Sequence, residues 1–188
     1  MTTTTRSRAP DSRHRGRGFT LVEVLIGATL GSFILLGVLT TFLFLGRSGA
    51  NLRNYSDMES QARKALETFA EDTRQASAVT WASATSVTLV VNSANITYAY
   101  ASGNFTRTAN GTSTTLLSGI TTFSFLAYSI TGTAITDYST ATALTTANGL
   151  TKQIQISLSA ARSTTTVNTA TNIVLSARYV MRNKHVTA

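Results

Sequence analysis

The residue that makes the strongest chemical demand in this sequence is Glu23, a carboxylate inside an apolar run from Phe19 to Leu45. It is the only charged residue of that run. A charged side chain near the middle of a bilayer costs roughly 2.5–3.5 kcal/mol on insertion scales. A plain membrane anchor has no use for such a group. Glu23 therefore needs a partner that stabilises its charge.

The apolar run is long enough to cross a membrane, and the charges around it indicate an orientation. No charged residue occurs from Val24 to Gly46, which is sufficient for about 30 Å of hydrocarbon. Basic residues stay preferentially on the cytoplasmic side. Only Arg47 and Arg53 follow closely, so we expect the N-terminus to stay inside and the bulk of the chain to be outside. Five arginines precede the run: Arg6, Arg8, Arg13, Arg15 and Arg17.

Two simpler interpretations of the N-terminus fit less well. An ordinary secretory signal has an apolar stretch of about 7–15 residues before a small-residue cleavage site. Ser48-Gly49-Ala50 resembles such a site, but the apolar stretch before it is far longer. A single-span anchor agrees with the length of the run but leaves Glu23 without a purpose.

Gly18 followed by Phe19-Thr20-Leu21-Val22-Glu23 resembles the class III signal of type IV pilins and pseudopilins. The resemblance implies that a prepilin peptidase cuts between Gly18 and Phe19 and that Phe19 is then N-methylated. It also implies that Glu23, the fifth residue of the mature chain, is needed for filament assembly.

Two partners for Glu23 follow from this resemblance. Cleavage would create an ammonium at Phe19, and opposite charges within about 4–6 Å stabilise each other. The Phe19 ammonium could belong to the next subunit of a filament, which is the arrangement that the resemblance favours. It could also belong to the same chain, because Phe19 and Glu23 are four residues apart on one helix.

The composition leaves room for one modest domain beyond the span. The chain has no cysteine, which excludes disulfides and thiolate chemistry. Many major pilins carry a C-terminal cysteine pair, so this chain departs from that subgroup. The net charge of +8 falls to +4 when residues 1–18 are removed, because they contain five arginines and Asp11.

The sequence predicts an α+β, pilin-like fold in four regions. Residues 1–18 form a basic leader that is cleaved, 19–46 a transmembrane and assembly helix, 47–78 an amphipathic helix, and 79–188 a β-rich periplasmic domain. We expect the long helix to pack against an antiparallel sheet through side chains at three- and four-residue steps. That stripe comprises Leu52, Tyr55, Met58, Ala62, Ala65, Leu66, Phe69, Thr73 and Ala76.

The last region alternates apolar and polar residues, which favours strands. Turn signals occur at Ser102-Gly103-Asn104, Asn110-Gly111 and Ser118-Gly119. We expect Ser129–Gly149 to be a long exposed loop and Arg162–Asn172 to be another. The predicted strands are Ser86–Val91, Asn95–Tyr100, Asn104–Thr108, Ser113–Leu117, Thr121–Tyr128, Lys152–Ser159 and Ile173–Arg182.

Two short motifs narrow the resemblance within the family. Asp72-Thr73-Arg74-Gln75-Ala76 and the closing Ser176–Asn183 segment resemble J-type minor pseudopilins and related minor pilins. K-type pseudopilins usually lack the fifth-position glutamate, so Glu23 argues against that type. The resemblance implies a structural subunit of the inner membrane, found in a filament or at its tip after processing. Its implied partners are the prepilin peptidase, other pilin or pseudopilin subunits and the assembly platform.

The alternatives are a principal filament-building pilin, a DNA-binding pilin and an adhesin-like module. Arg178, Arg182 and Lys184 lie close together, but a nucleic-acid footprint is usually a denser basic stripe, and they fit a solvated strand edge equally well. Catalysis is disfavoured, because Asp137 and His185 are the only acidic residue and the only histidine after Asp72. Asp137 alone also cannot hold calcium. We therefore expect neither a catalytic residue nor a metal or other cofactor.

Overall fold

The computed structural model describes residues 18–164 and 167–186, and the side chains of these except residues 162–171. The chain divides into two compact units, Met1–Leu45 and Gly46–Ala188. Helix α1, Leu21–Gln75, contributes to both. The chain thus combines a long N-terminal helix with antiparallel sheets, which confirms the predicted α+β, pilin-like fold.

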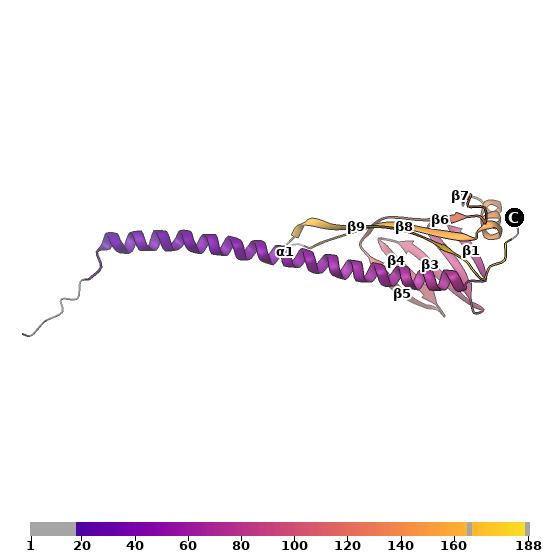
Figure 1. Cartoon of the computed structure of the whole chain (residues 1–188), viewed down its shortest axis with the longest axis horizontal. Coiled ribbons are helices and arrows are strands. Elements are labelled where there is room, and N and C mark those ends of the chain that lie inside the picture. Colours follow the sequence, from indigo (N-terminus) through magenta and orange to yellow (C-terminus); the bar gives the residue numbers. More distant parts are fainter. Residues whose placement is uncertain (1–17, 165–166, 187–188) are drawn as a thin grey trace, which may run out of the picture. The chain divides into compact units, whose positions relative to one another are not determined.

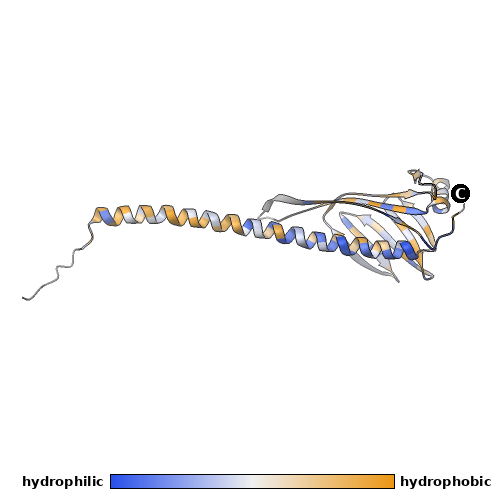
Figure 2. Cartoon of the chain, viewed as in Figure 1, coloured by the Kyte–Doolittle hydropathy of each residue, from blue (hydrophilic) through white to orange (hydrophobic). Residues whose placement is uncertain are grey.

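The part of α1 in the first unit exposes apolar side chains on every side. Phe33 is 74% exposed and Leu39 is 56% exposed, and Figure 2 shows apolar residues along this whole stretch. By length and composition α1 can cross a membrane. Apolar surface of this extent is unfavourable in water, so this part of the helix requires a lipid or protein environment.

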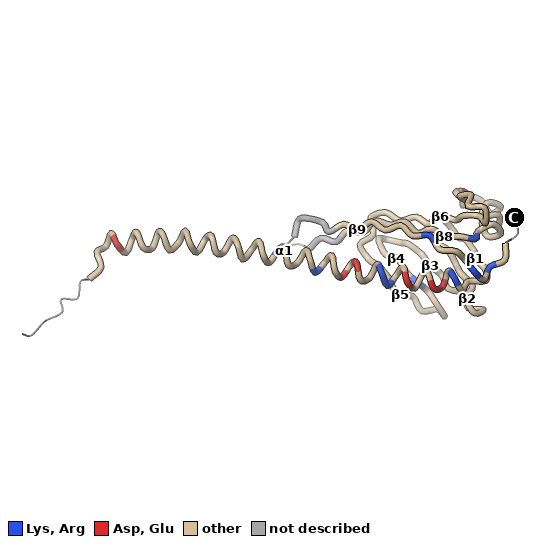
Figure 3. Tube along the Cα trace, in the orientation of Figure 1, with Lys and Arg blue, Asp and Glu red and all other residues tan. Residues whose placement is uncertain are grey.

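The part of α1 in the second unit buries one stripe. Met58, Ala62, Ala65 and Phe69 are all at most 2% exposed, which confirms the amphipathic pattern. The buried stripe begins later than predicted, because Leu52 is 70% exposed and Tyr55 43% exposed. The helix also ends at Gln75 rather than at residue 78. Charged residues of α1 are concentrated in this part (Figure 3), and Arg63 and Glu59 form an ion pair of 2.8 Å.

Two antiparallel sheets complete the second unit (Figure 1). The first has the order β1-β2-β3-β4-β5 and the second β7-β6-β8-β9. Seven observed strands overlap the predicted ones, and five of these, β2 to β6, agree within one residue at each end. The strands are β1 (Ala78–Ser83), β2 (Ser86–Val91), β3 (Ala94–Ala101), β4 (Asn104–Ala109), β5 (Thr112–Ser118), β6 (Ile120–Tyr128), β7 (Ala134–Ile135), β8 (Gln153–Thr164) and β9 (Val167–Val180).

The predicted turns occur where the sequence places them. Asn110 and Gly111 have φ angles of 51° and 74°, as a two-residue hairpin turn with two left-handed residues requires. Ser102 and Gly103 turn the chain in the same way between β3 and β4. Gly119 links β5 of one sheet to β6 of the other at φ 78°. A Cβ at this glycine would lie 2.7 Å from the Ala161 carbonyl oxygen, so no other residue fits without displacing the backbone.

Two predicted loops are wrong. Ser129–Gly149 contains β7 and helix α2, Ala141–Leu150, which packs against β1. Its threonine-rich sequence hides a helix that begins with Thr140, whose side chain accepts a hydrogen bond from the Ala143 amide. Arg162–Asn172 is also mostly strand, because β8 continues to Thr164 and β9 begins at Val167. A long ladder in register, from Gln153↔Val180 to Arg162↔Thr171, extends the hairpin.

The core lies between α1 and the two sheets, with Phe69 at its centre. Its ring contacts Tyr98 and Phe105 of the first sheet at centroid distances of 4.9 and 6.3 Å. It contacts Phe125 and Tyr179 of the second sheet at 5.5 and 5.8 Å. Aromatic side chains bury large apolar areas, so one residue of α1 ties both sheets to the helix.

Candidate processing and assembly site

The candidate site lies at the start of α1. Gly18, Phe19 and Thr20 precede the first helical residue, Leu21, and all are exposed. The Phe19 side chain is 81% exposed. The five predicted leader arginines lie outside the described residues. The peptide bond between Gly18 and Phe19 is therefore in an exposed segment immediately before the helix.

Thr20 and Glu23 cap the helix reciprocally. The Glu23 amide donates to the Thr20 hydroxyl at 3.3 Å, and the Thr20 amide donates to the Glu23 carboxylate at 3.5 Å. This is the capping-box arrangement, which satisfies two backbone donors that a helix start leaves unpaired. The Thr-x-x-Glu spacing was present in the sequence, but our sequence analysis missed it. Glu23 therefore has a local partner within its own chain.

The position of the Glu23 carboxylate is favourable for two further reasons. The first turn of a helix carries partial positive charge from its unpaired amides, which stabilises an anion. The carboxylate also reaches back to the amide of Thr20, the residue that follows Phe19. A positive charge created at the Phe19 nitrogen would thus arise close to an anion that is already held in place.

Residues 13–39 match the family model of the prokaryotic N-terminal methylation motif. The matched segment contains Gly18, Phe19 and Glu23, and it ends within the apolar part of α1. It carries the class III signal of type IV pilins and pseudopilins. No curated protein sequence matched the chain. The motif indicates that this pilin-like protein is processed by a prepilin peptidase and assembles with other pilins.

Three charged residues of this pilin-like protein, Asp72, Arg107 and Lys184, form internal contacts. Arg107 Nε donates to Asp72 at 2.8 Å and to the Tyr98 hydroxyl at 3.2 Å. Tyr98 in turn donates to the same Asp72 oxygen at 2.5 Å. Burial, followed by its hydrogen bond to Asp72, raises the pKa of Tyr98. The hydrogen bond that Arg107 itself donates to Asp72 raises the pKa of Arg107. This buried cluster joins α1 to β3 and β4, and our sequence analysis missed it because its members are far apart in the chain.

Lys184 is also internal, and our expectation of a solvated strand edge was wrong for it. The side chain is 8% exposed. Its ammonium donates to the backbone carbonyls of Asn148, Gly149 and Thr151, at and just beyond the end of α2. A cation at a helix C-terminus is favourable. Burial, and secondly the charge of Lys152, lower the pKa of Lys184 to about 8.

Arg178 is exposed but engaged on the outer face of the second sheet. Its guanidinium lies 3.5 Å from the centroid of the Tyr128 ring. It also donates to the Gln155 side chain through Nε and Nη2, at 3.2 and 3.0 Å. Of the three closely spaced cations near the C-terminus, one is buried and one is stacked. Such contacts do not favour a nucleic-acid footprint.

No cluster of three metal-ligating side chains occurs in the part of the chain that the structure describes. Asp137 accepts hydrogen bonds from the amide and hydroxyl of Ser139, at 2.9 and 2.7 Å. These two bonds lower its pKa. Asp137 therefore stabilises the turn before α2 through its hydrogen bonds to Ser139.

Proposed function

We propose that this protein is a minor pilin or pseudopilin, a structural subunit that primes or caps a type IV pilus-like or type II secretion filament. The observation that carries the proposal is the methylation motif, residues 13–39, which contains Gly18, Phe19 and Glu23 and overlaps the start of an apolar helix. In this proposal, residues 19–46 hold the subunit in the bacterial inner membrane until it is processed. The domain formed by residues 79–188 lies outside the cytoplasm.

Each residue of the motif has a separate role in the proposal. The prepilin peptidase removes the leader, residues 1–18, by cutting the Gly18–Phe19 bond, and Phe19 is then N-methylated. Methylation leaves the Phe19 amine charged. Glu23 provides the matching anion during assembly, with the inner-membrane platform and neighbouring subunits as partners. Nothing in this sequence of events requires a cofactor or a catalytic residue of the chain itself.

The capping box refines the role of Glu23. Before assembly, the carboxylate accepts from its own Thr20 amide and stabilises the helix start. In a filament it exchanges this weak bond for the ammonium of a neighbouring Phe19. Attraction between opposite charges is much larger in a low-dielectric environment than in water, so the exchange favours assembly.

The minor-subunit assignment is supported by two motifs that contact each other. The Arg182 amide donates to the Arg74 carbonyl at 3.2 Å, and the Asn183 side chain donates to the Gln75 carbonyl at 3.3 Å. The closing segment thus contacts the end of α1, and these contacts join the two motifs that resemble J-type minor pseudopilins. This contact gives both short motifs one structural purpose.

Two substitutions separate the charge of Glu23 from its capping role. Glu23→Gln retains a side chain that can complete a capping box but removes the charge. Thr20→Ala removes the cap and keeps the carboxylate. We expect Glu23→Gln to abolish incorporation into sheared filaments and Thr20→Ala to retain most of it, with normal cleavage in both. Normal incorporation of Glu23→Gln would refute the ion-pair role.

Subunit abundance distinguishes a minor from a principal subunit. We expect quantitative mass spectrometry of sheared filaments to find this chain at a small fraction of the most abundant pilin. If it is instead the dominant component of the filaments, it is the principal filament-building subunit.

A further inference from the structure

The two sheets have four edge strands, and one of them is long and unprotected. Strand β1 packs against α2, β7 has only 2 residues, and β5 has 7. Strand β9 has 14 residues. Proteins usually protect an edge by shortness, covering elements, proline or charge. Between Asn172 and Val180 the only such feature is Arg178.

The ladder shows which backbone groups of β9 are open. The Met181 amide donates to the Lys152 carbonyl at 2.9 Å, and antiparallel pairs alternate between bonded and non-bonded. The register is regular over this part. Because of this alternation, the amide and carbonyl groups of every second residue of β9 point away from β8. These residues are Asn172, Val174, Ser176, Arg178 and Val180.

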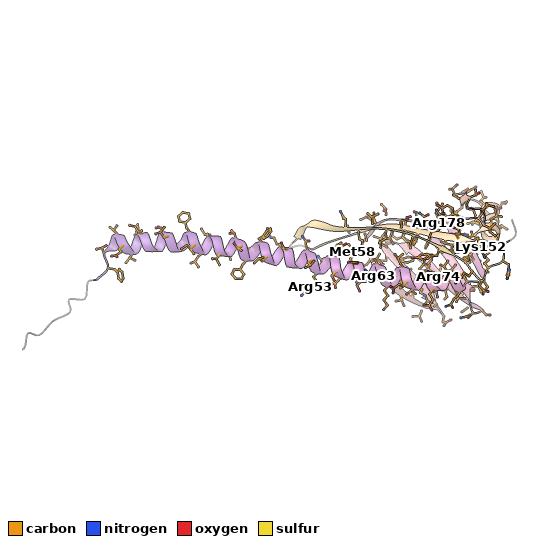
Figure 4. The ribbon with its side chains drawn as sticks, in the orientation of Figure 1. Arg53, Met58, Arg63, Arg74, Lys152 and Arg178 are labelled. Carbon is orange, nitrogen blue, oxygen red and sulfur yellow. The ribbon has the colours of Figure 1, made fainter. Side chains whose placement is uncertain are left out.

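A groove lies beside this open edge. The Arg182 amide follows Val180 in the same alternation and donates to the Arg74 carbonyl of α1. The open side of β9 is therefore next to α1 at the C-terminal end of the strand. That contact closes one end of a groove of about 560 Å³ between Tyr179 of β9 and the side of α1. Figure 4 labels Arg63 and Arg74 on α1 and Arg178 on β9. The α1 wall consists of Arg63, Leu66, Glu67, Ala70, Glu71, Arg74 and Gln75.

We propose that this edge and groove bind an extended strand of another polypeptide, which is added to the second sheet next to β9. Strand addition satisfies the open backbone groups, and alternate side chains of the added strand enter the groove. The edge from Asn172 to Val180 spans about 30 Å at roughly 3.3 Å per residue. It therefore accommodates a strand of up to nine residues.

The charges of the groove specify the chemistry of the occupant. Arg63 is paired with Glu59, and Glu71 accepts from Gln75. Within the described residues, Glu67 and Arg74 form no ion pair, and they are seven residues apart, which is about 10.5 Å along a helix. Side chains on one face of a strand repeat about every 6.6 Å. Two such repeats cover about 13 Å, and the long side chains of Glu67 and Arg74 bridge the difference from about 10.5 Å. The occupant thus has an acidic residue for Arg74, a basic one for Glu67 and an apolar one between them.

A synthetic peptide provides the probe. It has nine residues, with glutamate, valine and lysine at the third, fifth and seventh positions and threonine elsewhere. Added antiparallel to β9, it presents the glutamate to Arg74, because Arg74 lies at the C-terminal end of β9. A second peptide exchanges the glutamate and the lysine. Binding of each labelled peptide to the full chain in detergent micelles is measured by fluorescence anisotropy.

We expect the first peptide to bind about tenfold more tightly than the exchanged one, since two charged pairs are matched rather than opposed. Ser176→Pro removes one open amide without touching the bonds to β8, which edge positions tolerate. It should weaken binding of the first peptide at least about tenfold. Ser176→Ala keeps the amide and serves as the matched control, with near-unchanged binding. Unchanged Trp81 fluorescence verifies that each variant is folded.

Three results would overturn the proposal. The first is equal affinity for the two peptides, which shows that the groove charges do not select the occupant. The second is equal binding by Ser176→Pro and the unaltered chain. The third is self-association of the chain that Ser176→Pro abolishes but that neither peptide inhibits. In that case the edge of β9 binds a second copy of this chain rather than the proposed partner strand.

Discussion

The two units of this chain use the same helix in opposite ways. In the first unit α1 exposes apolar side chains on all sides, and Phe42 is 68% exposed. In the second unit it buries a narrow stripe, and Phe69 is fully buried between two sheets. The second unit thus provides its own core. The first unit depends on its surroundings, first the membrane and then, in our proposal, other subunits.

This difference explains what could be predicted from the sequence. The signal around Gly18 is local, so its residues could be identified without a structure. Strand β2 was predicted at its observed bounds because Val87, Leu89 and Val91 recur at every second position. The buried side of α1 from Met58 onward follows from helical spacing alone.

The features that escaped prediction depend on distant contacts. The sequence showed Asp72 only as part of a short motif, yet the residue is buried beside Tyr98 and Arg107, which lie 26 and 35 residues away. Lys184 contacts the end of α2 some 35 residues earlier in the chain. Strand β1 and helix α2 support each other, because the Trp81 amide donates to the Asn148 side chain at 2.7 Å. Neither element is evident from its own residues.

The largest expected effect on the second unit comes from Phe69→Ala. Truncation of a fully buried phenylalanine typically costs about 3–5 kcal/mol, and here it removes contacts to both sheets. We expect a strong loss of stability in urea unfolding followed by Trp81 fluorescence. Membrane insertion and cleavage at Gly18 should persist. Loss of cleavage in this variant would show that the units depend on each other.

The second effect concerns the buried cluster. Asp72→Asn keeps an acceptor for Tyr98 but removes the anion that pairs with Arg107. We expect a loss of about 1.5–3 kcal/mol in the free energy of unfolding, typical of hydrogen bonds to charged groups. Glu71→Gln, an exposed neighbour, is the matched control and should change stability by less than about 0.5 kcal/mol. If the two substitutions change the free energy of unfolding equally, the Asp72–Tyr98–Arg107 cluster does not contribute to stability.

The third effect depends on pH. With a pKa of about 8 in the folded protein and 10.5 ordinarily, Lys184 is charged in both states below pH 8. Above it, the unfolded chain holds a proton that the folded chain has lost, so folding becomes more favourable as the pH rises. We expect the stability of the unaltered chain relative to Lys184→Met to rise by up to about 1.4 kcal/mol per pH unit. A fall in this stability difference between pH 8 and pH 10 would contradict the expectation.

The smallest effect tests helix α2, which our sequence analysis missed. Thr140→Ala removes the side chain that accepts from the Ala143 amide at 3.1 Å. Loss of such a cap typically costs about 1 kcal/mol. Hydrogen exchange should show faster opening of α2, with little change at Phe69. Thr140→Ser retains the cap and should restore the protection.

The central claim is that the chain is cut and modified at a single bond, which creates the cation that Glu23 meets during assembly. Mass spectrometry of the intact native protein tests this most directly. The account predicts a chain that begins at Phe19 and carries one added methyl group on its terminal nitrogen. A chain that retains residues 1–18, begins elsewhere or lacks the methyl group would contradict it.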